Sequence, residues 1–157
     1  MHFLEIILHL NERLFINALD GITDSQAKER ISDHNNPLIW LAAHTVWARY
    51  NTAALLGKPG NNPFDGLFEN FKPFEESMVF DTLETIKAEW KKASALIREG
   101  LTTVSSEHLS SEAPFKNPTG DFTMGGTIAF LVQHESYDIG QAGLLKKYLT
   151  KQAMSYN

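Results

Sequence analysis

The chain has 157 residues, of which 43% are hydrophobic and 21% charged, and this globular composition excludes a disordered or collagen-like protein. Its 14 basic and 19 acidic side chains give a net charge of −5, which argues against a nucleic-acid partner. The absence of cysteine excludes disulfides, thiolate nucleophiles and cysteine zinc sites. Any metal must therefore be held by histidine and carboxylate groups.

One domain covering residues 1–157 is expected, because the length suits a single hydrophobic core and no repeat or linker interrupts the chain. The first ten residues lack the basic start of a signal peptide and are interrupted by Glu5 and His9. No apolar run approaches the ~18 residues that a membrane span requires. We therefore expect a cytoplasmic protein that does not bind membranes.

Apolar residues recur with a helical period in four long segments, whereas alternating strand patterns are short. The first helix is expected over residues 3–19 and is followed by a helical turn over residues 24–31. The core-facing stripe of this first helix is predicted to be Phe3, Ile6, Leu10 and Leu14.

The second helix is expected to begin at Asn36, a capping residue, with Pro37 at its first position, and to end at Gly57. Pro lacks the backbone N–H that would be unpaired at this position in any case. The fourth helix is expected over residues 123–149.

The third helix is predicted to begin at Asp81, which forms a capping-box pattern with Glu84, and to end at Gly100. Two connections, residues 57–80 and 101–122, are unusually long, and the aromatic residues of the first suggest that it is packed. These aromatic residues are Phe64, Phe68, Phe71, Phe74 and Phe80. Together the segments predict an all-α protein, a four-helix bundle with a long connection between its second and third helices.

Polar residues interrupt the apolar stripes of two helices. In the second helix His44 takes a position in line with Leu41 and Ala48. In the fourth helix His134, Asp138 and Gln141 follow Leu131 in steps of three and four residues. Similar depths along the two helices allow the histidines and the aspartate to meet in the core.

Buried polar groups without partners are costly, and a divalent cation would satisfy His44, His134 and Asp138 together. Two imidazoles and a carboxylate suit zinc, iron, nickel or manganese and leave coordination positions open for water or substrate. Gln141 lies one turn after Asp138 and is a candidate to orient its carboxylate.

Simpler interpretations exist for each of these residues. A core histidine is usually only hydrogen-bonded, and His134 with Asp138 could be a surface ion pair. Glu135 follows His134 as in zinc peptidases, but its position points about 100° away from the ligand stripe. The remaining histidines, His2, His9, His34 and His108, are expected to be solvated, and Trp40, Trp47 and Trp90 to pack in the bundle.

Two motifs resemble the DinB-like (DinB/YfiT) superfamily of metal-dependent enzymes. The first is the stretch from Asn36 to His44, followed by Leu-Leu-Gly ending at Gly57. The second is the stretch from His134 to Gln141, which is similar to the family's His-Glu-x-x-His-x-Gly-Gln signature. The resemblance runs from the first helix to about residue 149.

This resemblance implies a four-helix bundle, often a homodimer, that holds one divalent metal through three side chains. The matching positions are His44, His134 and Asp138, the last standing where the family usually has histidine. The implied function is a metal-dependent transferase or hydrolase acting on a small molecule, with a low-molecular-weight thiol as a candidate cosubstrate. The alternative is a metal-poor bundle that binds a small ligand or serves a structural role as a dimer.

Overall fold

The computed structural model describes residues 2–69 and 72–157, and these residues are helical apart from connecting segments and one isolated β-bridge. The four long helices are α1 (His2–Leu19), α3 (Leu38–Leu55), α4 (Leu83–Thr103) and α6 (Met124–Thr150). Two single-turn helices, α2 (Asp24–Lys28) and α5 (Ser106–Ser110), lie in connections. The predicted all-α class is confirmed.

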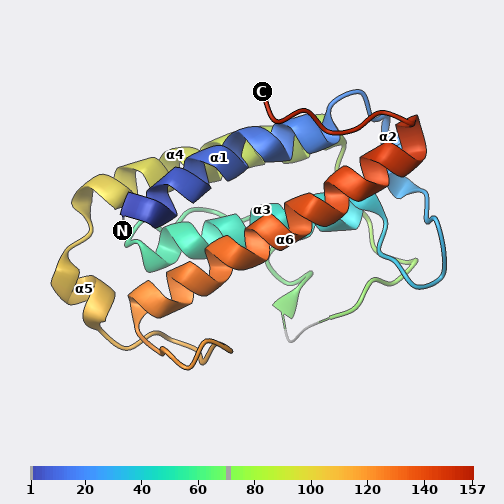
Figure 1. Ribbon diagram of the computed structural model, residues 1–157. Coiled ribbons are helices and arrows are strands. Elements are labelled where there is room, and N and C mark those ends of the chain that lie inside the picture. Colours follow the sequence, from blue (N-terminus) through green and yellow to red (C-terminus); the bar gives the residue numbers. More distant parts are fainter. Residues whose placement is uncertain (1, 70–71) are drawn as a thin grey trace.

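Each long helix packs against two others. Helix α3 contacts α4 and α6, and α1 contacts α6 and α4, so that the four helices enclose a common core (Figure 1). Helix α3 is the most enclosed, with 14 of its 18 residues buried, because helices lie on two sides of it and the segment after it covers a third. Polar side chains on α3 must therefore find partners inside the protein.

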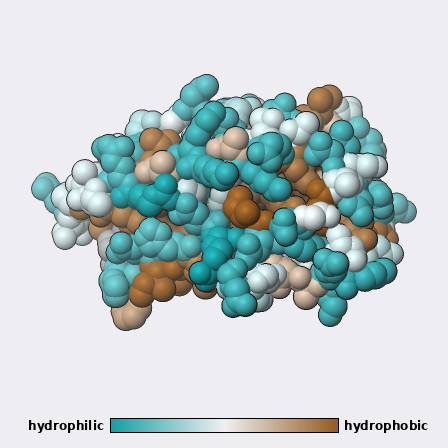
Figure 2. Space-filling model, turned by 90° about the horizontal axis from the view of Figure 1, so that it is seen from above, coloured by the Kyte–Doolittle hydropathy of each residue, from teal (hydrophilic) through white to brown (hydrophobic). Residues whose placement is uncertain are grey.

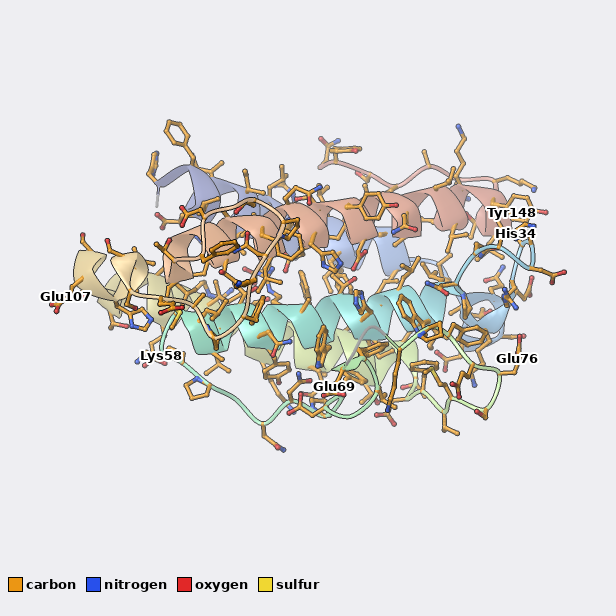
Figure 3. The ribbon with its side chains drawn as sticks, turned by 90° about the horizontal axis from the view of Figure 1, so that it is seen from below. His34, Lys58, Glu69, Glu76, Glu107 and Tyr148 are labelled. Carbon is orange, nitrogen blue, oxygen red and sulfur yellow. The ribbon has the colours of Figure 1, made fainter. Side chains whose placement is uncertain are left out.

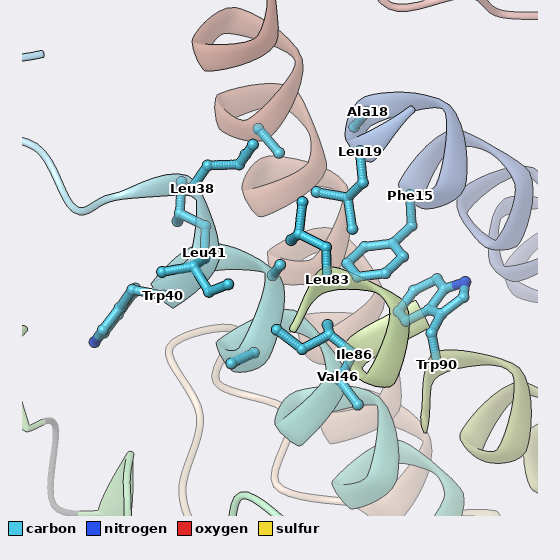
Figure 4. Close-up of a cluster of buried hydrophobic side chains, with 14 of the residues drawn as sticks. Phe15, Ala18, Leu19, Leu38, Trp40, Leu41, Val46, Leu83, Ile86 and Trp90 are labelled. Atoms are coloured by element: carbon cyan, nitrogen blue, oxygen red, sulfur yellow. The ribbon is translucent and has the colours of Figure 1, made fainter. Parts of the chain in front are cut away.

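The core is built from the apolar faces of these helices. Phe15 of α1 stacks on Trp90 of α4 with ring centroids 4.0 Å apart, and Ile86 and Val46 lie beside them (Figure 4). In the same view Trp40 points away from this group of side chains. The stripe expected for the third helix is confirmed, since its apolar residues at positions 83, 86, 90, 93 and 97 are all buried.

The predicted stripe of the first helix is largely wrong. Phe3, Ile6 and Leu10 are exposed, and the buried face is instead formed by Leu8, Asn11, Leu14, Phe15, Ala18 and Leu19. Helix α1 is apolar on two sides, so its sequence period alone does not identify the side that packs. The face seen from above, on the side of α1 and α4, is mainly hydrophilic with separate hydrophobic patches (Figure 2).

Three helix ends differ from the sequence prediction. Pro37 itself is the N-cap of α3, without a side-chain hydrogen bond from Asn36. Thr82 rather than Asp81 caps α4. In addition, the amide of Leu83 donates to Asp24 Oδ1 at 2.8 Å, and this partner is too distant in sequence to be predicted from the local pattern. Helix α4 continues past Gly100 to Thr103.

Gly100 has a packing role instead of ending the helix. A Cβ at this position would lie only 2.7 Å from Cβ of Leu56, so the missing side chain allows α4 to pass close to the end of α3. The residues expected to form one long loop at 101–122 include the short helix α5, which Ser105 caps through the amide of His108.

The connection between α3 and α4 returns along α3, and Glu69 lies near the middle of that helix (Figure 3). Its Phe64 and Phe68 are buried, and Phe74 and Phe80 pack against the core, which confirms that this connection is packed. Phe71 lies outside the described residues. None of the helices in the described residues has the length and apolar character needed to cross a membrane.

Candidate metal site

His44 lies in the middle of α3, with its ring held among aromatic side chains. Trp40 and Trp47, one turn before and one turn after, stack on it with centroids 4.8 and 5.7 Å away. Phe68, from the connection after α3, approaches the same imidazole edge-on at 5.1 Å. Trp90 packs in the core as expected, whereas Trp40 and Trp47 also fix the plane of His44.

Asp138 and His134 reach the same point from α6. Asp138 Oδ2 lies 2.9 Å from His44 Nδ1 and 3.9 Å from His134 Nδ1, and the two imidazole centroids are 5.1 Å apart. One candidate ligand atom from each residue lies within 4.8 Å of the others. The structure thus brings together the three side chains that the spacing predicted, and we call them the histidine–aspartate cluster.

The electrostatics of this cluster favour a neutral His134. Burial and the neighbouring His44 lower the pKa of His134, and Asp138 opposes this change in part. His134 Nδ1 is buried and, among the residues that the structure describes, has no hydrogen-bond partner. A neutral imidazole carries a free lone pair on one nitrogen, which is the form that binds metal ions.

The histidine–aspartate cluster is largely buried, but its two histidines remain partly accessible to solvent. Asp138 is nearly buried, with 4% of its side chain exposed, whereas the side chains of His44 and His134 are 16% and 29% exposed. Gln141 occupies its expected position one turn after Asp138, but Gln141 Nε2 is 3.5 Å from Asp138 Oδ1, the length of a weak hydrogen bond.

The residues present fit a divalent cation. An unpartnered buried nitrogen, a second imidazole and a nearly buried carboxylate converge from two helices, and this donor set suits zinc, iron, nickel or manganese. Two surface hollows of about 310 and 260 Å³ lie elsewhere, and the cluster lines neither of them.

Sequence reasoning missed a second polar cluster between α3 and α6. Arg49 Nη1 lies 2.7 Å from Glu135 Oε1, and both side chains are almost completely buried. Glu135 is therefore paired with Arg49 inside the bundle and is not one of the three side chains of the histidine–aspartate cluster, so the structure gives no support to the peptidase-like interpretation. The available signal was that Arg49 is the sole charged residue of α3.

The other histidines lie outside the cluster. His2, His9 and His34 are exposed, as expected, and His34 lies at the same end of the molecule as Tyr148 (Figure 3). His108 is half-buried, which corrects the expectation of a solvated side chain. Its Nε2 lies 2.8 Å from the carbonyl oxygen of Leu55 and joins α5 to the end of α3.

Comparisons with known proteins agree with this architecture. A crystal structure described as the conserved protein of a locus from Enterococcus faecalis has a similar fold, with a TM-score of 0.72. The two chains are 16% identical, and the match covers 96% of this chain and 97% of the other, which is a similarity of fold alone. None of the curated proteins compared matches this chain. The sequence pattern of the DinB superfamily matches residues 7–142, and this chain belongs to that superfamily.

Proposed function

We propose that this protein is a divalent-metal-dependent enzyme that acts on a small molecule, with His44, His134 and Asp138 as the metal ligands. The observation that carries the proposal is the convergence of these three side chains, together with a buried His134 Nδ1 that has no hydrogen-bond partner within residues 2–69 and 72–157. Membership of the DinB superfamily supports it, because the matched residues 7–142 include all three proposed ligands. Three protein ligands leave positions for water or substrate.

A bound divalent ion would supply Lewis acidity, which lowers the pKa of water or of a thiol and polarises a carbonyl oxygen. The protein's own residues would prepare the site for it. Trp40 and Trp47 hold the imidazole of His44 in one plane, and Phe68 covers the site from the connection after α3. Asp138 would contribute a negative charge that a third histidine would not.

Two reactions fit this proposal, transfer to a low-molecular-weight thiol and hydrolysis. The chain has no cysteine, so a transferase would have to take its thiol from solution. One assay separates the reactions, because a transferase consumes an electrophilic substrate only when thiol is present, whereas a hydrolase consumes its substrate without thiol. The homodimer implied by the family resemblance stays a prediction, which analytical ultracentrifugation tests.

A second candidate function is a metal-poor bundle that binds a small ligand or has a structural role. The observation that favours it is the direct contact between His44 Nδ1 and Asp138 Oδ2 at 2.9 Å, which satisfies two of the three side chains without a cation. In this case added metal would leave the thermal stability unchanged.

Elemental analysis of the untagged protein tests the proposal, together with melting curves of wild type and His134→Ala. Each protein is melted with and without zinc, nickel, manganese and iron(II), and a tag-free chain is needed because a histidine tag binds the same ions. We expect near-stoichiometric metal and a metal-dependent rise in Tm in wild type, both lost in the variant. Wild type with no bound metal and no rise in Tm would favour the second candidate.

A further inference from the structure

The guanidinium of Arg49 connects all four long helices. From its place on α3 it donates to Glu135 Oε1 of α6 at 2.7 Å and to Ser94 Oγ of α4 at 2.8 Å. A longer contact of 3.4 Å reaches the carbonyl oxygen of Leu8 in α1, and the Trp90 ring lies 3.9 Å from the guanidinium carbon. The guanidinium therefore has oriented partners on every side.

Stability alone is a poor explanation for this pair. Arg49 and Glu135 have only 1% and 3% of their side chains exposed, and desolvation of two charges commonly offsets their attraction. Apolar side chains of similar volume often stabilise a core equally well. What a buried ion pair supplies, and apolar contacts do not, is a directional link between two particular positions.

Arg49 and Glu135 each lie within a few residues of a member of the histidine–aspartate cluster on the same helix. Glu135 directly follows His134 and precedes Asp138 by three residues, and Arg49 follows His44 by five. At 1.5 Å of rise per residue the pair lies about 5–8 Å along the helices from the His44–Asp138 contact. A slide of α6 by half a turn, roughly 2.7 Å, would break both contacts together.

Other bonds of α6 do not fix its position along α3. Among the described residues, the side-chain hydrogen bonds between these two helices are those of His44 with Asp138 and Arg49 with Glu135.

Two further polar contacts of α6 run to α1 instead of α3. They join Asn11 Nδ2 to Ser136 Oγ at 2.9 Å and Lys146 Nζ to the carbonyl oxygen of Asn17 at 2.6 Å.

We propose that Arg49 and Glu135 are positioning residues, which set the register of α6 against α3 and so place His134 and Asp138 opposite His44. The inference rests on the proposed metal site and deepens it. Neither residue touches the metal in this account. Their contribution is to hold ligands from two helices at a fixed spacing before any ion arrives.

The test uses the untagged full chain and zinc alone as the probe. In the double variant Arg49→Met with Glu135→Leu, both charges are removed, so no unpaired charge remains in the core. Urea unfolding measures the stability of each zinc-free protein, and competition with a chromophoric chelator gives the Kd for zinc. We expect a folded double variant of near wild-type stability whose Kd for zinc is about 10–100-fold higher. A Kd equal to that of wild type would overturn the proposal.

Lys146→Met is the matched control, because it removes a buried charge that links α6 to α1 rather than to α3. We expect its Kd for zinc to stay within about twofold of wild type. If the double variant does not fold, Glu135→Asp replaces it, since this change keeps both charges and shortens the link by one methylene. A rise of at least about threefold in Kd is then expected, and an unchanged Kd would overturn the proposal.

Failure of the metal site and failure of the positioning role give different results. If wild type binds no zinc, the proposed function fails, but the register can still be examined by crystallography of the Glu135→Asp variant. The positioning role predicts that the distance between His44 Nδ1 and Asp138 Oδ2 lengthens beyond hydrogen-bonding range in that variant. A distance still near 2.9 Å would contradict it.

Discussion

The interface between α3 and α6 contains two polar clusters that differ in how completely their groups are paired. The Arg49–Glu135 pair is almost fully buried, and the guanidinium also bonds Ser94 and approaches the backbone of Leu8. The histidine–aspartate cluster is partly exposed, and no hydrogen-bond partner for His134 Nδ1 is found in the described part of the chain. The first cluster is complete within the chain, whereas the second has capacity for a ligand.

This difference separates a structural role from a binding role for residues of the same chemical kind. A buried charge with all its partners present needs nothing from solution, and its removal should affect folding first. A group of ligand atoms with an unfilled nitrogen should instead respond to added metal. Removal of one partner of the buried pair should therefore act first on the stability of the zinc-free protein, whereas removal of a residue of the histidine–aspartate cluster should act first on the response to zinc.

The largest effect on stability is expected when one partner of the buried pair is removed. Arg49→Met leaves the Glu135 carboxylate buried without its guanidinium, which should lower the free energy of unfolding by about 3–5 kcal/mol. Urea denaturation measures this change. The control is Arg98→Met, which removes an exposed ion pair with Glu12 and should cost only about 0–1 kcal/mol. Equal losses in the two variants would contradict the distinction between buried and exposed pairs.

The second largest effect is expected in the histidine–aspartate cluster, whose stability should depend on added metal. With free zinc at 100 times its Kd, wild type should gain about 2.7 kcal/mol in free energy of unfolding. Asp138→Ala should lose most of this gain, and without metal it should be less stable than wild type by about 1–3 kcal/mol, because His44 Nδ1 loses its acceptor. Chemical denaturation with and without zinc measures both changes. A full zinc-dependent gain in the variant would show that Asp138 is not a ligand.

A smaller effect is expected from pH in the metal-free protein. Burial lowers the pKa of His134 below the ~6.5 of the unfolded chain. The carboxylate of Asp138 raises this pKa in part, and the neighbouring His44 lowers it further. The unfolded state therefore binds more protons as the pH falls, and stability should decrease from about pH 6.5 down to the folded pKa. Below that pKa the loss is constant. Replacement of His134 by Gln should flatten this slope in urea denaturation between pH 7.5 and 5, and an identical slope would contradict the account.

The smallest effect is expected at Gln141. Its 3.5 Å contact with Asp138 Oδ1 is long, so Gln141→Ala should change the free energy of unfolding by less than about 0.5 kcal/mol. If Gln141 orients the carboxylate when metal is bound, the Kd for zinc should rise by up to about tenfold. Titration of the untagged variant with zinc measures this. An unchanged Kd for zinc would show that Gln141 does not contribute to metal binding.

The histidine–aspartate cluster could be predicted because its residues occupy apolar stripes of helices that are buried on those sides. His44, His134 and Asp138 each stand where a leucine would be expected, and helical spacing alone places them on the core side. The packed connection after α3 was also predictable, since a loop with many phenylalanines cannot remain in water without cost.

The remaining features depend on tertiary contacts that the sequence does not encode locally. Helix α1 has apolar residues on two sides, and only its contacts with α4 and α6 determine that Phe15 packs while Phe3 does not. The start of α4 depends in part on Asp24, which is distant in sequence. The buried role of Arg49 and Glu135 appears only when all four helices are assembled, because arginine and glutamate usually lie on the surface.

We expect one divalent ion to bind between α3 and α6 through the histidine–aspartate cluster. Anomalous diffraction at the zinc edge, from crystals of the untagged protein grown with zinc, locates such an ion. One strong peak is expected about 2.0–2.2 Å from a nitrogen of His44, a nitrogen of His134 and an oxygen of Asp138. Zinc found only at exposed histidines such as His9, with no peak between the helices, would contradict it.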